Sequence, residues 1–272
     1  MTREEWLRTH AFLEPVARLL ARAEAAAARI DCPAVELPQW GDYADDYEAG
    51  FALLHSGDAT IDLAPAGAMT LELLDALAAS APPDRVAADA RDLRAELGRE
   101  PGAAQRVADS LLGEGAGEIA SPGLLRFLGW TAARRYLQPV LVEFARWRNQ
   151  DRWQRSNCPV CGALPAMAQL IGVDPGRIRF LSCGCCHSRW RYRRTACPFC
   201  EGDSHRIQVL AVEGEGGLRI DHCEACRGYL KTYAGQGSED VMLADWTSLH
   251  LDVLAQDRGL ERKAASLYSL DE

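Results

Sequence analysis

The chain has 272 residues, and 30 Lys and Arg against 39 Asp and Glu give it a formal net charge of -9. This acidic balance disfavours a general nucleic-acid-binding protein, because such proteins need Lys and Arg to neutralise phosphates. The opening MTREEWLRTH lacks the apolar core of a signal peptide, and no run of about 18 apolar residues predicts a membrane-spanning helix. We therefore expect a soluble cytoplasmic protein, in a compartment where thiols stay reduced.

Residues 1–150 are predicted to form a helical domain. Apolar residues recur at helical spacing over 6–30, and alanines strengthen the second part of that segment. Further helices are expected at 43–55, 70–79, 84–97 and 103–112. Thr70 and Asp84 are expected to cap the N-termini of theirs.

The longest predicted helix starts at Ser121-Pro122, a typical cap and first-turn pair, and extends to about residue 148. Pro139 is expected to kink it. We expect this whole half to be a scaffold without chemistry of its own.

From residue 151 the residue pattern changes to short strand-like runs separated by Gly, Pro and cysteine pairs. The expected strands are 166–171, 177–182, 189–193, 207–212 and 218–221. The run Gly214-Glu215-Gly216-Gly217 predicts a hairpin loop, and a last helix is expected at 240–256.

Nine of the ten cysteines lie between Cys158 and Cys226, and eight of them form four CxxC pairs. The pairs are Cys158/Cys161, Cys183/Cys186, Cys197/Cys200 and Cys223/Cys226. Between the first two pairs lie 21 residues, between the last two 22, and between the middle pairs 10. This near-equality predicts a tandem duplication of one unit. The remaining early cysteine, Cys32, is expected to be a small buried residue.

Paired CxxC turns are typical of metal sites. Two such turns let four thiolates surround one ion with bonds of about 2.3 Å for zinc. Tetrahedral sulfur ligation suits zinc or a rubredoxin-like iron, and the spacing does not separate them. Glycines after the second cysteine, Gly162, Gly202 and Gly228, are expected to relieve the tight turns.

The sequence thus predicts an α+β fold with a mostly helical N-terminal domain, two tandem rubredoxin-like or zinc-ribbon metal-binding units and a C-terminal helix. The expected divisions are 1–150, 151–195, 196–235 and 236–272. A crossed pairing stays open, in which Cys183/Cys186 join Cys197/Cys200 and Cys158/Cys161 join Cys223/Cys226; the repeat disfavours it. Cys185, the extra thiol of the CGCC run, is expected to be a bystander.

One basic stretch, residues 187–194 (HSRWRYRR), stands out within the cysteine-rich half. In a strand, Arg189, Arg191 and Arg193 share one face while Trp190 and Tyr192 share the other. The arginine face is either a solvated surface or a docking surface for an acidic partner segment.

These motifs resemble those of the FdhE family of formate dehydrogenase accessory proteins. The resemblance rests on CPVCG at 158–162, a tryptophan four residues after Cys186, CPFC followed by an acidic residue, and the CxxC-x-GYLK run that begins at Cys223. It implies a non-enzymatic, iron- or zinc-binding assembly factor that contacts the catalytic subunit of formate dehydrogenase. By position, it assigns the metal to the eight cysteines of the CxxC pairs.

Two other classes of function use the same cysteines. Thiol or iron redox chemistry is one, although a thioredoxin-type CxxC opens a helix after a strand, and here CPVC and CPFC precede strand-like runs. A zinc-ribbon nucleic-acid module is the other, and the net charge disfavours it.

Overall fold

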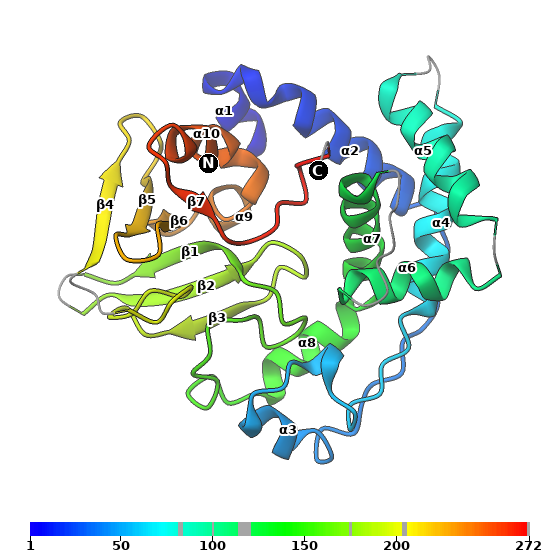
Figure 1. Cartoon of the computed structure of the whole chain (residues 1–272), viewed down its shortest axis with the longest axis horizontal. Helices are drawn as coiled ribbons and strands as arrows, with labels where there is room; N and C mark the ends of the chain where they lie inside the picture. Colours follow the sequence, from blue (N-terminus) through cyan, green and yellow to red (C-terminus); the bar gives the residue numbers. More distant parts are fainter. Residues whose placement is uncertain (81–83, 100, 114–120, 174–175, 203–205, 271–272) are drawn as a thin grey trace. The chain divides into compact units, whose positions relative to one another are not determined.

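The computed structural model of the chain describes residues 1–80, 84–99, 101–113, 121–173, 176–202 and 206–270 (Figure 1). Contacts divide the chain into two compact units, both discontinuous in sequence. The sheet unit comprises Met1–Pro15, Asp46–Ala52 and Asn149–Ser266, and the helical unit comprises Val16–Asp45, Leu53–Arg148 and Leu267–Glu272. The contiguous division expected at 150, 195 and 235 stays a prediction.

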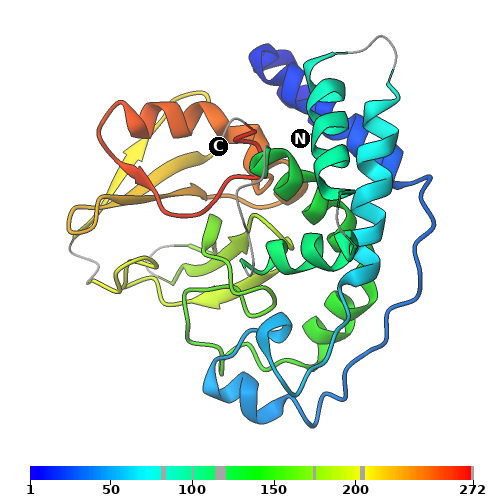
Figure 2. The ribbon, with the colours of Figure 1, turned by 45° about the vertical axis from the view of Figure 1, so that its right-hand side comes forward.

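Helices account for nearly all the regular structure before residue 149. They are α1 (Arg3–Thr9), α2 (Glu14–Ala27), α3 (Ala44–Ala49), α4 (Ala64–Ala78), α5 (Arg85–Leu97), α6 (Ala103–Leu111), α7 (Pro122–Tyr136) and α8 (Gln138–Trp147), with 3-10 turns η1 (Ala11–Leu13) and η2 (Leu53–His55). In the helical unit α4 packs against α5, α6 and α7 (Figure 2). Gly67 allows the close approach to α6, because a Cβ there would lie 1.9 Å from the Ala104 carbonyl oxygen.

No helix in the described ranges has both the length and the apolar character that crossing a bilayer requires.

The observed helix boundaries confirm one of the two predicted N-caps and contradict the other. Asp84 caps α5 as expected and accepts a hydrogen bond from a first-turn N–H at 2.8 Å. Thr70 does not cap α4, which already begins at Ala64; its hydroxyl instead donates to the Ala66 carbonyl at 2.8 Å, inside the helix. The kink expected at Pro139 is a full break between α7 and α8.

The strands of the sheet unit form one seven-stranded sheet (Figure 1). They are β1 (Pro165–Ile171), β2 (Ile178–Cys183), β3 (Arg189–Tyr192), β4 (Ile207–Ala211), β5 (Leu218–Cys223), β6 (Gly228–Tyr233) and β7 (Glu261–Arg262). The order is β3-β2-β1-β6-β5-β4, with β7 paired to β6. The first copy of the repeat comprises β1, β2 and β3, and the second comprises β4, β5 and β6. Strands within each copy pair antiparallel, whereas β1 and β6 pair in parallel and join the two copies.

The joining strand β6 was missing from the sequence predictions. Its residues, GYLKTY, are all buried. A strand that is covered on both faces loses the alternation of apolar and polar residues by which strands are recognised. Lys231, in the middle of the run, suggests a solvent-exposed position, yet it is only 1% exposed.

Burial of Lys231 is explained by a closed network of charges. Its ammonium lies 2.7 Å from a carboxylate oxygen of Asp245 and 2.7 Å from one of Asp252. Arg262 pairs with the same two carboxylates at 2.8 and 2.7 Å, and the Tyr229 hydroxyl donates to Asp252 at 2.7 Å. Burial alone would raise the pKa of Asp245, but the two cations outweigh it and hold that pKa far below its usual value.

This network fastens the C-terminal segment to β6. The segment consists of α9 (Glu239–Met242), η4 (Asp245–Ser248), α10 (Leu249–Gln256) and β7. The single helix expected at 240–256 is therefore divided into three short pieces. The division places Asp245 and Asp252 opposite Lys231, so two carboxylates meet two cations without a net charge.

We predict that Lys231→Met destabilises the protein strongly. Removing one partner of a buried ion pair leaves the opposite charge uncompensated, at a cost of about 3–5 kcal/mol. The free energy of unfolding, measured by urea denaturation of metal-loaded protein, should fall accordingly. Lys263→Met is the matched control, because that lysine pairs with Glu261 at the surface and its loss should change little. Equal stabilities of the two variants would contradict the network's role.

Candidate metal centres

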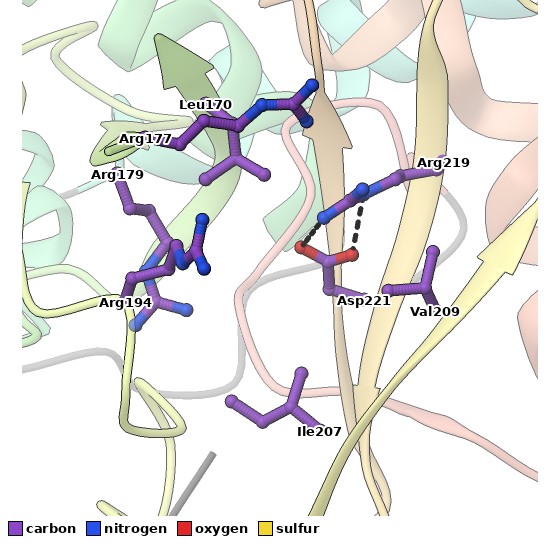
Figure 3. Close-up of a pocket in the computed structure, with 8 residues that line it drawn as sticks. All are labelled: Leu170, Arg177, Arg179, Arg194, Ile207, Val209, Arg219 and Asp221. Carbon is purple, nitrogen blue, oxygen red and sulfur yellow. Dashed lines mark hydrogen bonds and ion pairs between the residues drawn. The ribbon is translucent and has the colours of Figure 1, made fainter. Parts of the chain in front are cut away.

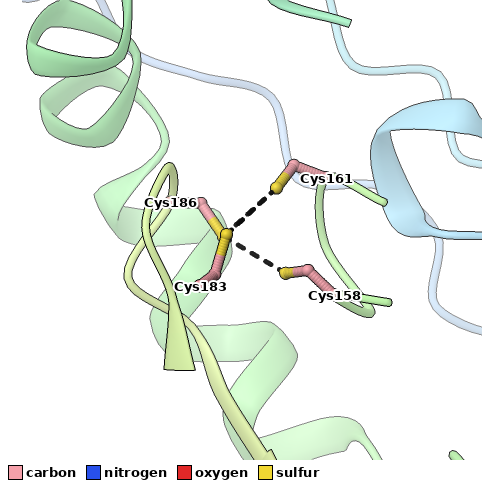
Figure 4. Close-up of side chains that lie close together, drawn as sticks. All are labelled: Cys158, Cys161, Cys183 and Cys186. Carbon is pink, nitrogen blue, oxygen red and sulfur yellow. Dashed lines mark hydrogen bonds between the residues drawn. The ribbon is translucent and has the colours of Figure 1, made fainter. Parts of the chain in front are cut away.

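The first cysteine cluster unites the first two CxxC pairs. Sγ atoms lie 3.4 Å apart for Cys158 and Cys186, 3.4 Å for Cys161 and Cys183, and 3.7 Å for Cys161 and Cys186. All four sulfurs lie within 4.8 Å of one another and converge on one point (Figure 4). None of these cysteines forms a disulfide.

The second cluster repeats the arrangement with the last two pairs. Its Sγ atoms lie 3.7 Å apart for Cys197 and Cys226 and 3.8 Å for Cys200 and Cys223, again all within 4.8 Å. The structure thus groups the cysteines as the repeat predicts, and the crossed pairing does not occur.

Strand register brings together the two CxxC turns, or knuckles, of each cluster. The last residue of β2, Cys183, pairs with Pro165 at the start of β1, shortly after the first knuckle. In the second copy Cys223, the last residue of β5, pairs with Ile207 at the start of β4. Antiparallel pairing of the first two strands therefore places the second knuckle of each copy beside its first.

Each cluster has the dimensions of a tetrahedral metal site. With metal–sulfur bonds of about 2.3 Å, the edges of a sulfur tetrahedron are about 3.8 Å long. The observed separations of 3.4–3.8 Å match that edge and far exceed a disulfide bond. The two clusters could therefore bind two metal ions, and the sulfur donors fit iron and zinc alike.

Every knuckle places a left-handed residue directly after its second cysteine. Gly162 has φ 72°, and the corresponding residues of the other knuckles are His187, Glu201 and Arg227, with φ of 61°, 57° and 56°. The glycines expected to relieve two of these turns, Gly202 and Gly228, lie one residue too late. Non-glycine residues rarely adopt this conformation, and such strain persists only where surrounding structure fixes it.

Backbone N–H groups point at the sulfurs of three knuckles. The N–H two residues after the first cysteine approaches its Sγ at 3.4 Å for Cys158, 3.3 Å for Cys183 and 3.4 Å for Cys197. Hydrogen bonds of this kind stabilise a thiolate, because they favour the charged form. The turns are thus shaped for ionised sulfur.

The thiols of one cluster cannot all ionise by themselves. Burial raises the pKa of Cys158 well above its usual value. For Cys183 burial acts in the same direction, but hydrogen bonds from neighbouring thiols outweigh it and hold the pKa well below normal. In the second cluster burial raises the pKa of Cys197 to about 12, whereas at Cys223 burial is outweighed by hydrogen bonds from the backbone N–H groups of Cys226 and Ala225, followed by those from neighbouring thiols, which lower the pKa. One thiolate accepts bonds from protonated neighbours, so full ionisation requires a cation.

The two clusters differ in exposure. All four cysteines of the first are buried, whereas in the second Cys200 is exposed and Cys226 is half-buried. Solvent and chelators can therefore reach the second cluster more readily.

The two remaining cysteines lie outside the clusters. Cys185 is buried beside the first cluster, where its N–H donates to Cys183 Sγ at 3.3 Å and its thiol forms hydrogen bonds with the thiols of Cys161 and Cys183. Cys32 is exposed, so the expectation of a buried residue was wrong. It follows Asp31 in a segment without regular structure, between α2 and α3.

Residues 189–192 of the basic stretch form β3 with the expected alternation, and Arg193 follows the strand. Trp190 and Tyr192 are buried, while Arg191 is exposed and pairs with Asp151 at 2.9 Å. Arg191 and Arg193 line a 280 Å³ pocket together with three further arginines, 177, 179 and 194.

A second pocket, of 260 Å³, shares those three further arginines and reaches the other copy of the repeat. Figure 3 shows Arg177, Arg179 and Arg194 along one side and the Arg219–Asp221 ion pair on the other. Arginine side chains of both copies therefore line these two adjoining pockets, which together are called the basic surface of the sheet unit.

Comparison with known proteins relates the chain to FdhE proteins. A family model described as the FdhE central domain matches residues 157–194. A curated FdhE homologue from Pseudomonas aeruginosa is 31% identical over 208 residues, which make up 72% of this chain and 66% of the relative. One from Aquifex aeolicus is 33% identical over 132 residues, 46% of each chain. The chain thus covers less than two thirds of these curated relatives.

The fold is also similar to a solved structure. The crystal structure of the FdhE protein from Pseudomonas aeruginosa matches with a TM-score of 0.62 and 26% sequence identity, covering 94% of this chain and 88% of that one.

We predict that a chelator removes an ion from the second cluster before one from the first. With zinc-loaded protein and a colorimetric chelator, release should occur in two phases of one equivalent each, because only the second cluster has an exposed cysteine. Cys200→Ser should abolish the fast phase and leave the slow one. Release in a single phase, or loss of the slow phase instead, would refute the assignment.

Proposed function

We propose that this chain, which belongs to the FdhE family, is a metal-binding accessory protein for the maturation or assembly of formate dehydrogenase. In this role it contacts the catalytic subunit in the cytoplasm and is not itself an enzyme. The observation that carries the proposal is the convergence of eight cysteines on two points at tetrahedral spacing.

The ligands in this proposal are the eight clustered cysteines. Cys158, Cys161, Cys183 and Cys186 hold one ion, and Cys197, Cys200, Cys223 and Cys226 hold the other. Metal binding at each site contributes on the order of 10 kcal/mol to folding. Because four protein thiolates complete each tetrahedron, no coordination position is left for a substrate, which is typical of structural sites and supports a non-enzymatic role.

A second candidate function is electron transfer by iron at the same sites. It is supported by the backbone N–H groups directed at Cys158, Cys183 and Cys197, since hydrogen bonds to sulfur tune the potential of iron–thiolate centres. A reversible change in visible absorption on reduction of the iron-loaded protein would favour it. An absorption that reductant leaves unchanged would favour a structural role.

The contact surface for the catalytic subunit is proposed to be the basic surface on the sheet unit. Arg191 and Arg193 are exposed there, and their present partners, Asp151 and Glu201, are surface carboxylates at 2.9 and 3.6 Å. Exposed ion pairs contribute little to stability, so an acidic partner segment can replace them easily.

We predict that Cys183→Ser and Cys185→Ser differ in metal content. Cys183 belongs to the first cluster and Cys185 does not, although both are buried and only two positions apart. Elemental analysis after anaerobic purification should find two equivalents in Cys185→Ser and one in Cys183→Ser. Loss of metal from Cys185→Ser would show that the ligand set at this knuckle is wrong.

We also predict that charge reversal on β3 weakens capture of the partner. The wild-type chain should retain formate dehydrogenase catalytic subunits in a pull-down, and R191E/R193E should bind about tenfold more weakly, equivalent to about 1.4 kcal/mol. R85E/R146E is the matched control, since both arginines are exposed surface residues of the helical unit.

The outcomes separate the surface from the function. Unchanged binding by R191E/R193E would exclude the basic surface and leave the accessory role intact. Failure of the wild-type protein, with both ions bound, to retain any catalytic subunit would contradict the accessory role itself.

A further inference from the structure

Two histidines and a glutamate converge in the sheet unit, apart from the cysteine clusters. His10 follows α1, Glu215 lies in the loop between β4 and β5, and His250 lies on α10. The Nε2 atom of His250 lies 2.7 Å from one oxygen of Glu215, and that of His10 lies 3.3 Å from the same oxygen. One ligand atom from each residue lies within 4.8 Å of the other two.

The ring of His10 is held in one orientation. It stacks on Trp6 with centroids 3.7 Å apart, and the Trp6 indole N–H donates to the Thr247 carbonyl at 3.0 Å. Its centroid lies 5.3 Å from that of the His250 ring, and the two rings are tilted by 37°. These contacts direct the Nε2 edge of His10 toward Glu215.

The Nδ1 atom of His10 has two hydrogen-bond partners. It lies 3.1 Å from the Trp6 carbonyl, which can only accept, and 2.9 Å from the Thr9 hydroxyl, which already donates to that carbonyl. With its proton on Nδ1 and donated to the Trp6 carbonyl, the neutral ring presents a lone pair at Nε2. A backbone acceptor on the distal nitrogen is the usual partner of a metal-bound histidine. His250 lacks this support, because its buried Nδ1 has no hydrogen-bond partner in the described parts of the chain.

The geometry fits a cation between these groups. In this tautomer the lone pair of His10 faces a carboxylate oxygen, and a bound cation would offset their repulsion, in a site where the side chains of His10, Glu215 and His250 are only 7%, 12% and 18% exposed. For metal bonds of about 2.1 Å to nitrogen and oxygen, neighbouring ligand atoms lie about 3.0–3.4 Å apart. The separation of 3.3 Å between His10 and Glu215 lies within this range, whereas the 2.7 Å between His250 and Glu215 is a hydrogen-bond distance that a bound ion would lengthen.

We propose that His10, Glu215 and His250 form a third metal site, for a divalent transition-metal ion such as zinc or ferrous iron. Two imidazoles and one carboxylate are a donor set that such ions favour, and three protein ligands leave a coordination position open. The site differs from the cysteine clusters in having nitrogen and oxygen donors. It also joins three segments of the sheet unit: the N-terminal helix, the β4–β5 loop and the C-terminal segment.

The test is a calorimetric titration of the full chain with Zn²⁺, after both cysteine clusters have been filled with zinc. The wild-type protein should take up one further equivalent. H250Q and E215Q should take up none, and they keep the two cluster ions because neither residue lies near a clustered cysteine in sequence. H55Q, which changes an exposed histidine of the helical unit, is the control and should behave as wild type.

A cobalt titration decides the question even where a variant folds poorly. In wild-type protein with zinc-filled clusters, added Co²⁺ should give weak d–d absorption without sulfur-to-cobalt charge transfer. No further uptake by the wild-type chain would overturn the proposal and leave a hydrogen-bonded His–Glu–His group. Uptake that H250Q and E215Q retain, or a thiolate charge-transfer band, would overturn it as well.

Discussion

Four sulfur atoms packed at van der Waals distance around one point are the constraint on which the sheet unit depends. A cluster of buried thiols can release its protons together only if a cation takes their place, since burial opposes each thiolate and neighbouring thiolates repel. The knuckles are built for the charged state, with N–H groups aimed at sulfur and left-handed residues at Gly162, His187, Glu201 and Arg227. The fold around each cluster is therefore suited to hold the proposed ion.

The strands transmit this local constraint to the rest of the unit. In each copy the second knuckle emerges from the end of the middle strand, so a bound ion fixes the register of the first two strands. The third strand of the second copy, β6, then becomes the centre of the sheet by pairing with β1. Because β6 also carries Lys231, the buried charges that hold the C-terminal segment depend on the same junction.

Sequence patterns were sufficient at the cysteine pairs and at the start of α5, where local chemistry decides the structure. The CxxC spacing gave the grouping of the eight cysteines, and Asp84 marked the start of α5. Sequence patterns were insufficient where tertiary contacts decide the structure. Lys231 concealed a central strand because its charge is balanced by Asp245 and Asp252, which follow it in later segments. The meeting of His10 with His250 leaves no local pattern, since nearly the whole chain separates them.

The junction between the two copies has a geometric consequence for self-association. Copies joined by a two-fold axis would use the same strand twice, whereas here the first strand of one copy meets the third strand of the other. Such a head-to-tail contact does not close, so β4 and β3, again a first and a third strand, remain at the two ends of the sheet. If β4 of one molecule paired with β3 of another, the sheet would be extended in the same head-to-tail way, and filaments would result. The arginines of β3 oppose this, because a charged edge strand discourages pairing with a second chain.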